Sequence, residues 1–170
     1  SFPFYIQSEI IYDFTIEFCN RYINMRSRTH DQMVQAARSG KQNIAEGYLQ
    51  KSIESRLKLV GVARGSLEEL LNDYQDFLRQ KGLPLWGKDH EQAQKIRKLA
   101  YAKDRSYTTY KTYLEASPPE VAANTMICLI HQTNYLLDQQ LRALEKEFLK
   151  EGGFTERLYN ARSQARKRRE

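Results

Sequence analysis

Histidine spacing is the first test for chemistry in this sequence, because di-metal carboxylate centres on helices are built from Glu-x-x-His pairs. The three histidines are His30, His90 and His131, and none of them has a glutamate three residues earlier. The residue at that position before His131 is a cysteine, Cys128. The sequence therefore excludes a metal-dependent oxidase of the ferritin type.

The two cysteines provide at most part of a zinc site. Cys128 and His131 share one helix face, and Cys19 would face them from a neighbouring helix, but a structural zinc ion needs four ligands. We interpret both thiols as small buried side chains, and we expect neither a metal nor a cofactor.

Two glycines, Gly61 and Gly65, have a spacing that superficially suggests a phosphate-binding loop. They lie inside a predicted helix with no strand before it, whereas such loops follow a strand. A glycine inside a helix costs up to about 1 kcal/mol relative to alanine. We therefore interpret Gly65 as a point where another helix passes closely, and expect Gly65→Leu to disrupt the contact between the second and third helices.

Polar residues flank the apolar stripes of the same two helices. Asn43 and Glu46 lie one turn apart on the second helix, and Ser66 and Glu69 lie on the third. If these groups point inward they must be hydrogen-bonded, because burying an unpaired amide or carboxylate is costly. One interpretation is an interhelical network with Ser66 or Arg64 as partner; the other is a carboxylate that binds a ligand or acts as acid or base.

Apolar residues at three- and four-residue steps predict four long helices, over residues 5–25, 31–46, 53–80 and 118–150. Ser52 is a suitable N-cap for the third helix, and Gly82 followed by Pro84 ends it. Gly47 is suited to cap the second helix in a left-handed conformation, and Ser117 to form a capping box at the start of the fourth.

These helices predict an all-α fold, an up-down-up-down four-helix bundle over residues 1–153. The segment 83–116 is too long for a turn, and we expect a short extra helix within it, at about 88–103, lying across the bundle or its end. Residues 154–170 form a basic C-terminal segment, either a short helix or frayed chain.

Charge is concentrated at that end of the chain. The 170 residues carry a formal net charge of +6, with 41% hydrophobic and 28% charged residues, which fits one globular domain. Residues 154–170 hold six basic and two acidic residues, against 21 basic and 19 acidic in the rest. The basic residues of the tail are Arg157, Arg162, Arg166, Lys167, Arg168 and Arg169.

Two cysteines are too few for a disulfide framework, and no run approaches the roughly 20 apolar residues of a membrane span. We therefore expect a cytoplasmic protein without a membrane partner.

Two runs, residues 35–47 (QAARSGKQNIAEG) and residues 63–70 (ARGSLEEL), carry a family resemblance. They resemble the signature of a bacterial four-helix-bundle family. That family includes proteins encoded by intervening sequences within 23S ribosomal RNA genes and accessory proteins of diversity-generating retroelements. The resemblance implies an up-down bundle, a homopentamer and a non-enzymatic role, with nucleic-acid binding only in the retroelement branch.

The leading functional expectation is therefore a non-enzymatic, self-assembling bundle that acts as a scaffold or accessory protein. The alternative is an RNA- or DNA-binding protein that uses the basic tail together with Arg38 and Lys41 on the second helix. In that alternative, stacking platforms for bases would come from four tyrosines, Tyr101, Tyr107, Tyr110 and Tyr113. The other interpretation of these tyrosines is that they pack the inserted segment onto the bundle.

Overall fold

The computed structural model describes residues 3–152 and 154–169, and all regular elements within them are helices. The all-helical class expected from the sequence is confirmed. In chain order the helices are α1 (Pro3–Tyr22), α2 (Arg28–Leu49), α3 (Ile53–Gln80), α4 (Glu91–Leu99), α5 (Tyr107–Tyr110), α6 (Thr112–Glu115), α7 (Pro119–Glu151) and α8 (Phe154–Lys167).

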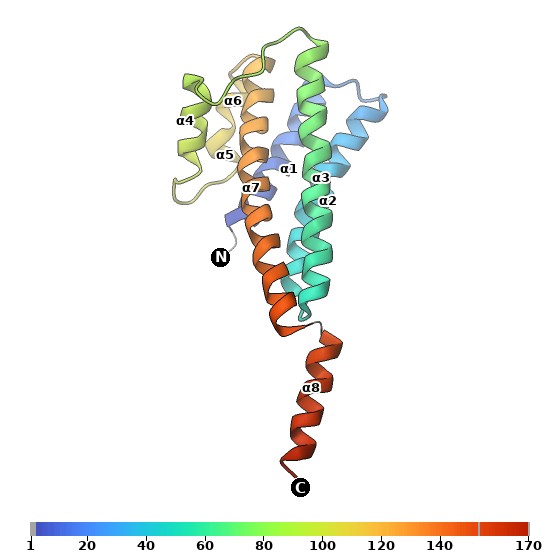
Figure 1. Ribbon diagram of the computed structural model, residues 1–170. Helices are drawn as coiled ribbons and strands as arrows, with labels where there is room; N and C mark the ends of the chain where they lie inside the picture. Colours follow the sequence, from blue (N-terminus) through green and yellow to red (C-terminus); the bar gives the residue numbers. More distant parts are fainter. Residues whose placement is uncertain (1–2, 153, 170) are drawn as a thin grey trace.

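Four long helices, α1, α2, α3 and α7, form a helical bundle in which each contacts two others (Figure 1). The contacts join α1 to α2, α2 to α3, α3 to α7, and α7 back to α1. The short helices α4, α5 and α6 lie against one side of this bundle, on α7 and α1. Helix α8 extends away from the bundle beyond the end of α7.

Aromatic side chains fill the part of the core where α1 meets α3. The ring of Phe18 lies 4.9 Å from that of Tyr74 and 5.0 Å from that of Phe77, both in edge-on geometry. Tyr74 is fully buried, and its hydroxyl shares a 2.8 Å hydrogen bond with Thr15 Oγ1. The hydrogen bond satisfies the polar end of a ring that otherwise stabilises the fold by apolar burial.

Both ends of α3 follow the sequence prediction. The hydroxyl of Ser52 accepts a hydrogen bond from the Ser55 amide, as an N-cap does. At the other end Gly82 has φ +65°, and the Leu83 amide donates to the Leu78 carbonyl. This is a Schellman cap, which needs a residue that tolerates the left-handed conformation.

Two predicted caps are wrong. Gly47 lies inside α2, which continues to Leu49, and it is buried there without a positive φ. Ser117 does not cap α7, because its hydroxyl donates to the carbonyl of Thr112 and Pro118 occupies the N-cap position. The hydroxyl thus closes the chain turn after α6 instead of starting α7.

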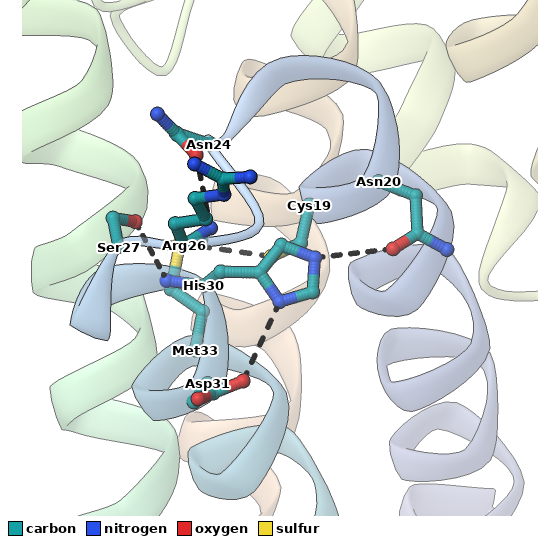
Figure 2. Close-up of polar contacts among 8 residues, drawn as sticks. All are labelled: Cys19, Asn20, Asn24, Arg26, Ser27, His30, Asp31 and Met33. Atoms are coloured by element: carbon teal, nitrogen blue, oxygen red, sulfur yellow. Dashed lines mark hydrogen bonds and ion pairs between the residues drawn. The ribbon is translucent and has the colours of Figure 1, made fainter.

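The turn between α1 and α2 explains why α1 ends earlier and α2 starts earlier than expected. Ser27 accepts a hydrogen bond from the His30 amide and caps α2, which therefore begins at Arg28 (Figure 2). His30 Nε2 lies 3.1 Å from the side-chain oxygen of Asn20, so the ring bridges the two helices. Capping at Ser27 leaves only five residues, 23–27, between the helices.

The segment 83–116 contains three short helices instead of the single one expected at 88–103. Of that range only α4, Glu91–Leu99, is helical, and it packs along α7 instead of crossing the bundle (Figure 1). The side chain of His90 caps α4 by accepting from the Gln92 amide. Among the described residues, no helix combines the length and apolar character needed to cross a membrane.

Candidate interaction surfaces

Two of the predicted motif residues, Asn43 and Ser66, are linked through Ser39, which the sequence prediction did not single out. Ser39 Oγ lies 2.8 Å from Ser66 Oγ, which links α2 to α3. Asn43 Nδ2 donates to the Ser39 carbonyl at 2.9 Å and to its hydroxyl at 3.1 Å. The three side chains form an interhelical network on half-buried positions, as the first of the two interpretations expects.

The two carboxylates of the motif lie apart from that network. Glu46 is exposed, and in the described part of the chain its side chain makes no hydrogen bond or ion pair. Glu69 is also exposed and lines an open polar groove of about 660 Å³ between α2 and α3, to which Glu46 does not contribute. The two glutamates therefore do not face one cavity, as an acid–base pair would.

Asp73 lines the same groove beside Glu69. Partial burial, together with the negative charges of Asp76 and Glu69, raises the pKa of Asp73 above its ordinary value. Glu69, Asp73 and Asp76 lie close together toward the C-terminal end of α3, where the repulsion between their negative charges costs free energy. This part of α3 therefore presents an acidic surface.

Arg64 connects α3 to α7 instead of meeting Asn43 or Glu46. Its Nε donates to Asp138 at 2.8 Å, and its Nη1 donates to Glu68 at 2.7 Å. Asn134 adds a longer contact of 3.4 Å to the same Glu68 oxygen. Asp138 lies 74 residues from Arg64, so no local spacing in the sequence could have identified it.

The glycine that permits close helix packing is Gly40 and not Gly65. A Cβ added at Gly40 would lie 2.8 Å from Leu67 Cδ2, and one at Gly47 would lie 3.4 Å from Val60 Cγ2. A Cβ at Gly61 or Gly65 would meet nothing within 4 Å. The expectation that Gly65 sits at the crossing of the second and third helices is therefore wrong.

The basic residues are placed in two separate groups. Arg38 is exposed on α2, and the amine of Lys41 lies 5.0 Å from the ring of Tyr12, which is a cation–π contact with α1. On and just after α8, Arg157 is half-buried and the other five are exposed, namely Arg162, Arg166, Lys167, Arg168 and Arg169. The structure does not bring the two groups onto a common helix.

Most of the tyrosines singled out in the sequence pack inward. Tyr110 is fully buried, and Tyr107 and Tyr113 pack against the core. The Tyr107 ring stands edge-on to Phe14, and its hydroxyl donates to Glu115 at 3.3 Å. Tyr101, 88% exposed, is the only one of the four with a free face for stacking.

The cysteines lie in different surroundings. Cys19 is buried with its sulfur 3.9 Å from that of Met33 (Figure 2), and burial raises the pKa of its thiol to about 12. Cys128 lines a cavity with His131 beside α4. Within residues 3–152 and 154–169, no three His, Cys, Asp or Glu residues are grouped so as to hold a metal ion.

Sequence reasoning also missed the anchor of the inserted segment. The side chain of Asn124 on α7 is 1% exposed; it accepts from the Trp86 amide at 2.9 Å and donates to the Pro84 carbonyl at 3.0 Å. In the sequence, this anchor is indicated only by the presence of a polar residue, Asn124, on the apolar stripe of α7.

These features define an all-helical bundle protein with polar links between its helices and an added helical segment on one side. No family model, no curated protein and no solved structure matches the chain.

Proposed function

We propose that this protein is a non-catalytic scaffold that assembles from several copies of the chain through the outer face of α3. In this proposal α1, α2, α3 and α7 are the up-down-up-down four-helix bundle of each copy. Five copies is the number that the family resemblance implies.

The observation that carries the proposal is the open backbone at Gly61 and Gly65. They lie four residues apart, so both face the same side of α3, and a Cβ at either would meet no atom of another helix within 4 Å. Each costs the helix about 1 kcal/mol relative to alanine. A second helix that packs closely on this face would use the space that the protomer leaves empty.

An exposed apolar side chain on α3 supports the same proposal. Val62, between the two glycines in the sequence, is 45% exposed. Contacts between copies would remove such side chains from water at about 25 cal/mol per Å².

The test is the mass of the full chain by multi-angle light scattering, alone and as Gly65→Gln. We expect a defined oligomer for the unchanged chain, about 100 kDa if five copies of 20.0 kDa assemble. Gly65→Gln adds a long side chain to the open face and should reduce the mass, with no loss of helix content in circular dichroism. Arg142→Gln is the matched control, since it places glutamine at an exposed site on α7.

A monomer at every concentration, or an oligomer unchanged by Gly65→Gln, would count against assembly through α3.

A second function, binding of RNA or DNA, is favoured by α8. This helix extends away from the bundle, and together with the two residues after it carries five of the tail's six basic residues on exposed side chains. The same light-scattering experiment with structured RNA tests it. Replacing the five exposed basic residues by glutamine should abolish a salt-dependent mass increase if α8 binds phosphates, and leave the mass of the protein alone unchanged.

A further inference from the structure

A groove runs between α4 and α7 on the side of the bundle that carries the inserted segment. It consists of two adjoining cavities of about 300 Å³ and 460 Å³, which share His131 and Gln132 on α7 as lining residues. Each cavity falls within the size range of small-molecule sites. The groove lies apart from the open face of α3.

Side-chain amides hold the walls of this groove in place. Asn124 fixes the chain at Pro84 and Trp86, and Gln132 donates to the carbonyl of Arg97 at 3.2 Å. Gln7 of α1, 2% exposed, donates in turn to Gln132 at 3.4 Å. Because amides from α1 and α7 bind the inserted segment directly, the groove is formed before any ligand arrives.

Positive charge in the groove is not balanced by carboxylates. Lys88 and Arg97 line the first cavity and Arg105 the second, and no Asp or Glu in the described chain lines either one. No carboxylate oxygen among the described residues lies within 4.0 Å of the charged nitrogens of these three. The guanidinium of Arg97 contacts the Lys88 carbonyl, and that of Arg105 contacts the Gln7 side chain, both uncharged partners.

The two acidic groups of α7 near the groove do not pair with its cations. Glu120 accepts from the indole nitrogen of Trp86 at 3.1 Å and keeps its negative charge there, whereas Asp138 is paired with Arg64 on α3. Among the charged side chains that line the groove itself there are therefore three cations and no carboxylate, in a bundle whose overall charge is close to neutral.

Aromatic rings line the same groove. One face of the Trp86 indole is stacked on His90 at 4.5 Å, and the residue contributes to the wall of the first cavity. Tyr101 and Tyr135 border the second cavity and are 88% and 62% exposed. Exposed rings of this kind provide faces on which a planar ligand stacks.

We infer that the groove between α4 and α7 binds a nucleoside phosphate, whose phosphate group contacts the cations and whose base stacks on the tyrosines. A planar ring with an attached anion matches a lining that combines unpaired cations with exposed aromatic faces. The nucleotide is either free or one unit of a single strand. This site requires neither assembly through α3 nor the charge of α8.

Trp86 reports on the site directly, because it is the only tryptophan in the chain. The experiment titrates the full chain with AMP, adenosine, inorganic phosphate and a short oligoadenylate while its fluorescence is recorded. A saturable change with AMP, weaker with adenosine or phosphate alone, would support a free nucleotide. A change with oligoadenylate only would assign the groove to a single strand. No change with either AMP or oligoadenylate at millimolar concentration would overturn the inference, as would phosphate binding as well as AMP.

Two variants with matched controls separate the site from the rest of the surface. Tyr101→Ala and Lys88→Gln, both at exposed positions, should each weaken binding about tenfold, since stacking and phosphate contact contribute comparably. Tyr159→Ala on α8 and Lys58→Gln on α3 change the same residue types outside the groove and should leave the affinity unchanged. Equal affinities in all four variants would show that the fluorescence change arises elsewhere.

Discussion

Replacing Gly40 by alanine should destabilise the protein, although helix propensity alone predicts the opposite. The added Cβ would lie 2.8 Å from Leu67 Cδ2 and 2.9 Å from Cγ, so Leu67 would have to retreat by about 0.6 Å to reach an ordinary 3.4 Å contact. Leu67 is fully buried, and close packing of a protein interior leaves a buried side chain little room to move. Overpacking costs about 1–3 kcal/mol, and the gain in helix propensity offsets about 1 kcal/mol.

The expected net loss is about 1 kcal/mol in the free energy of unfolding, which lowers Tm by about 2–4 °C in a domain of this size. Urea unfolding followed by circular dichroism measures it. In a Leu67→Ala background both contacting atoms are absent, so Gly40→Ala should there raise stability by up to about 1 kcal/mol. Stabilisation in the unchanged background, or the same effect in both backgrounds, would refute the packing argument.

Two further predictions concern buried polar groups. Asn124→Ala leaves the Trp86 amide and the Pro84 carbonyl without their partner. It should therefore lower the free energy of unfolding by about 1–3 kcal/mol and shift the fluorescence emission of Trp86 to longer wavelength. Unchanged emission would contradict the role of Asn124 as the anchor of this segment. For Cys19, burial and then the charge of Asp73 raise the thiol pKa from 9.0 to about 12 in the folded protein. The neutral buried thiol contributes its full stabilisation below pH 9, and this stabilisation is lost as the pH rises toward 12, because between these values the thiol ionises readily only in the unfolded chain. Cys19→Ala should therefore reduce the slope with which the free energy of unfolding falls at alkaline pH.

Local chemistry made some helix ends predictable and others not. The start of α3 at Ser52 and its end at Gly82 depend on hydrogen bonds within a few residues, so the sequence alone located both. At Ser117 the hydroxyl donates to the Thr112 carbonyl and Pro118 occupies the N-cap position, so the expected cap did not form. A cap is predictable only when no competing partner lies next to it in the folded chain.

Glycine positions show a different limit. The sequence shows that Gly40 and Gly65 both lie inside helices, but the cost of a side chain depends on what each one faces. Gly40 faces Leu67 across the contact of α2 with α3, and Gly65 faces outward on the same helix as Leu67. The direction of each glycine depends on the rotation of its own helix in the bundle, α2 for Gly40 and α3 for Gly65, which the apolar stripe defines only approximately.

Polar residues on the apolar stripe of α7 indicate that another segment packs on this helix, which the sequence prediction overlooked. A helix carbonyl can accept one bond from a side-chain amide four residues later, as in Asn43 and Asn124, but the remaining polar groups of a buried amide need partners in another segment. Asn124 meets this requirement through the backbone at Pro84 and Trp86, and Gln132 through the Arg97 carbonyl at the end of α4. A buried amide on a helix stripe therefore predicts a polar partner in a packed segment, which is loop backbone for Asn124, the helical Leu129 carbonyl for Gln7 and the Glu68 carboxylate for Asn134. Asn124 on the stripe of α7 thus indicates that another segment packs there, and the folded chain identifies that segment as 83–116.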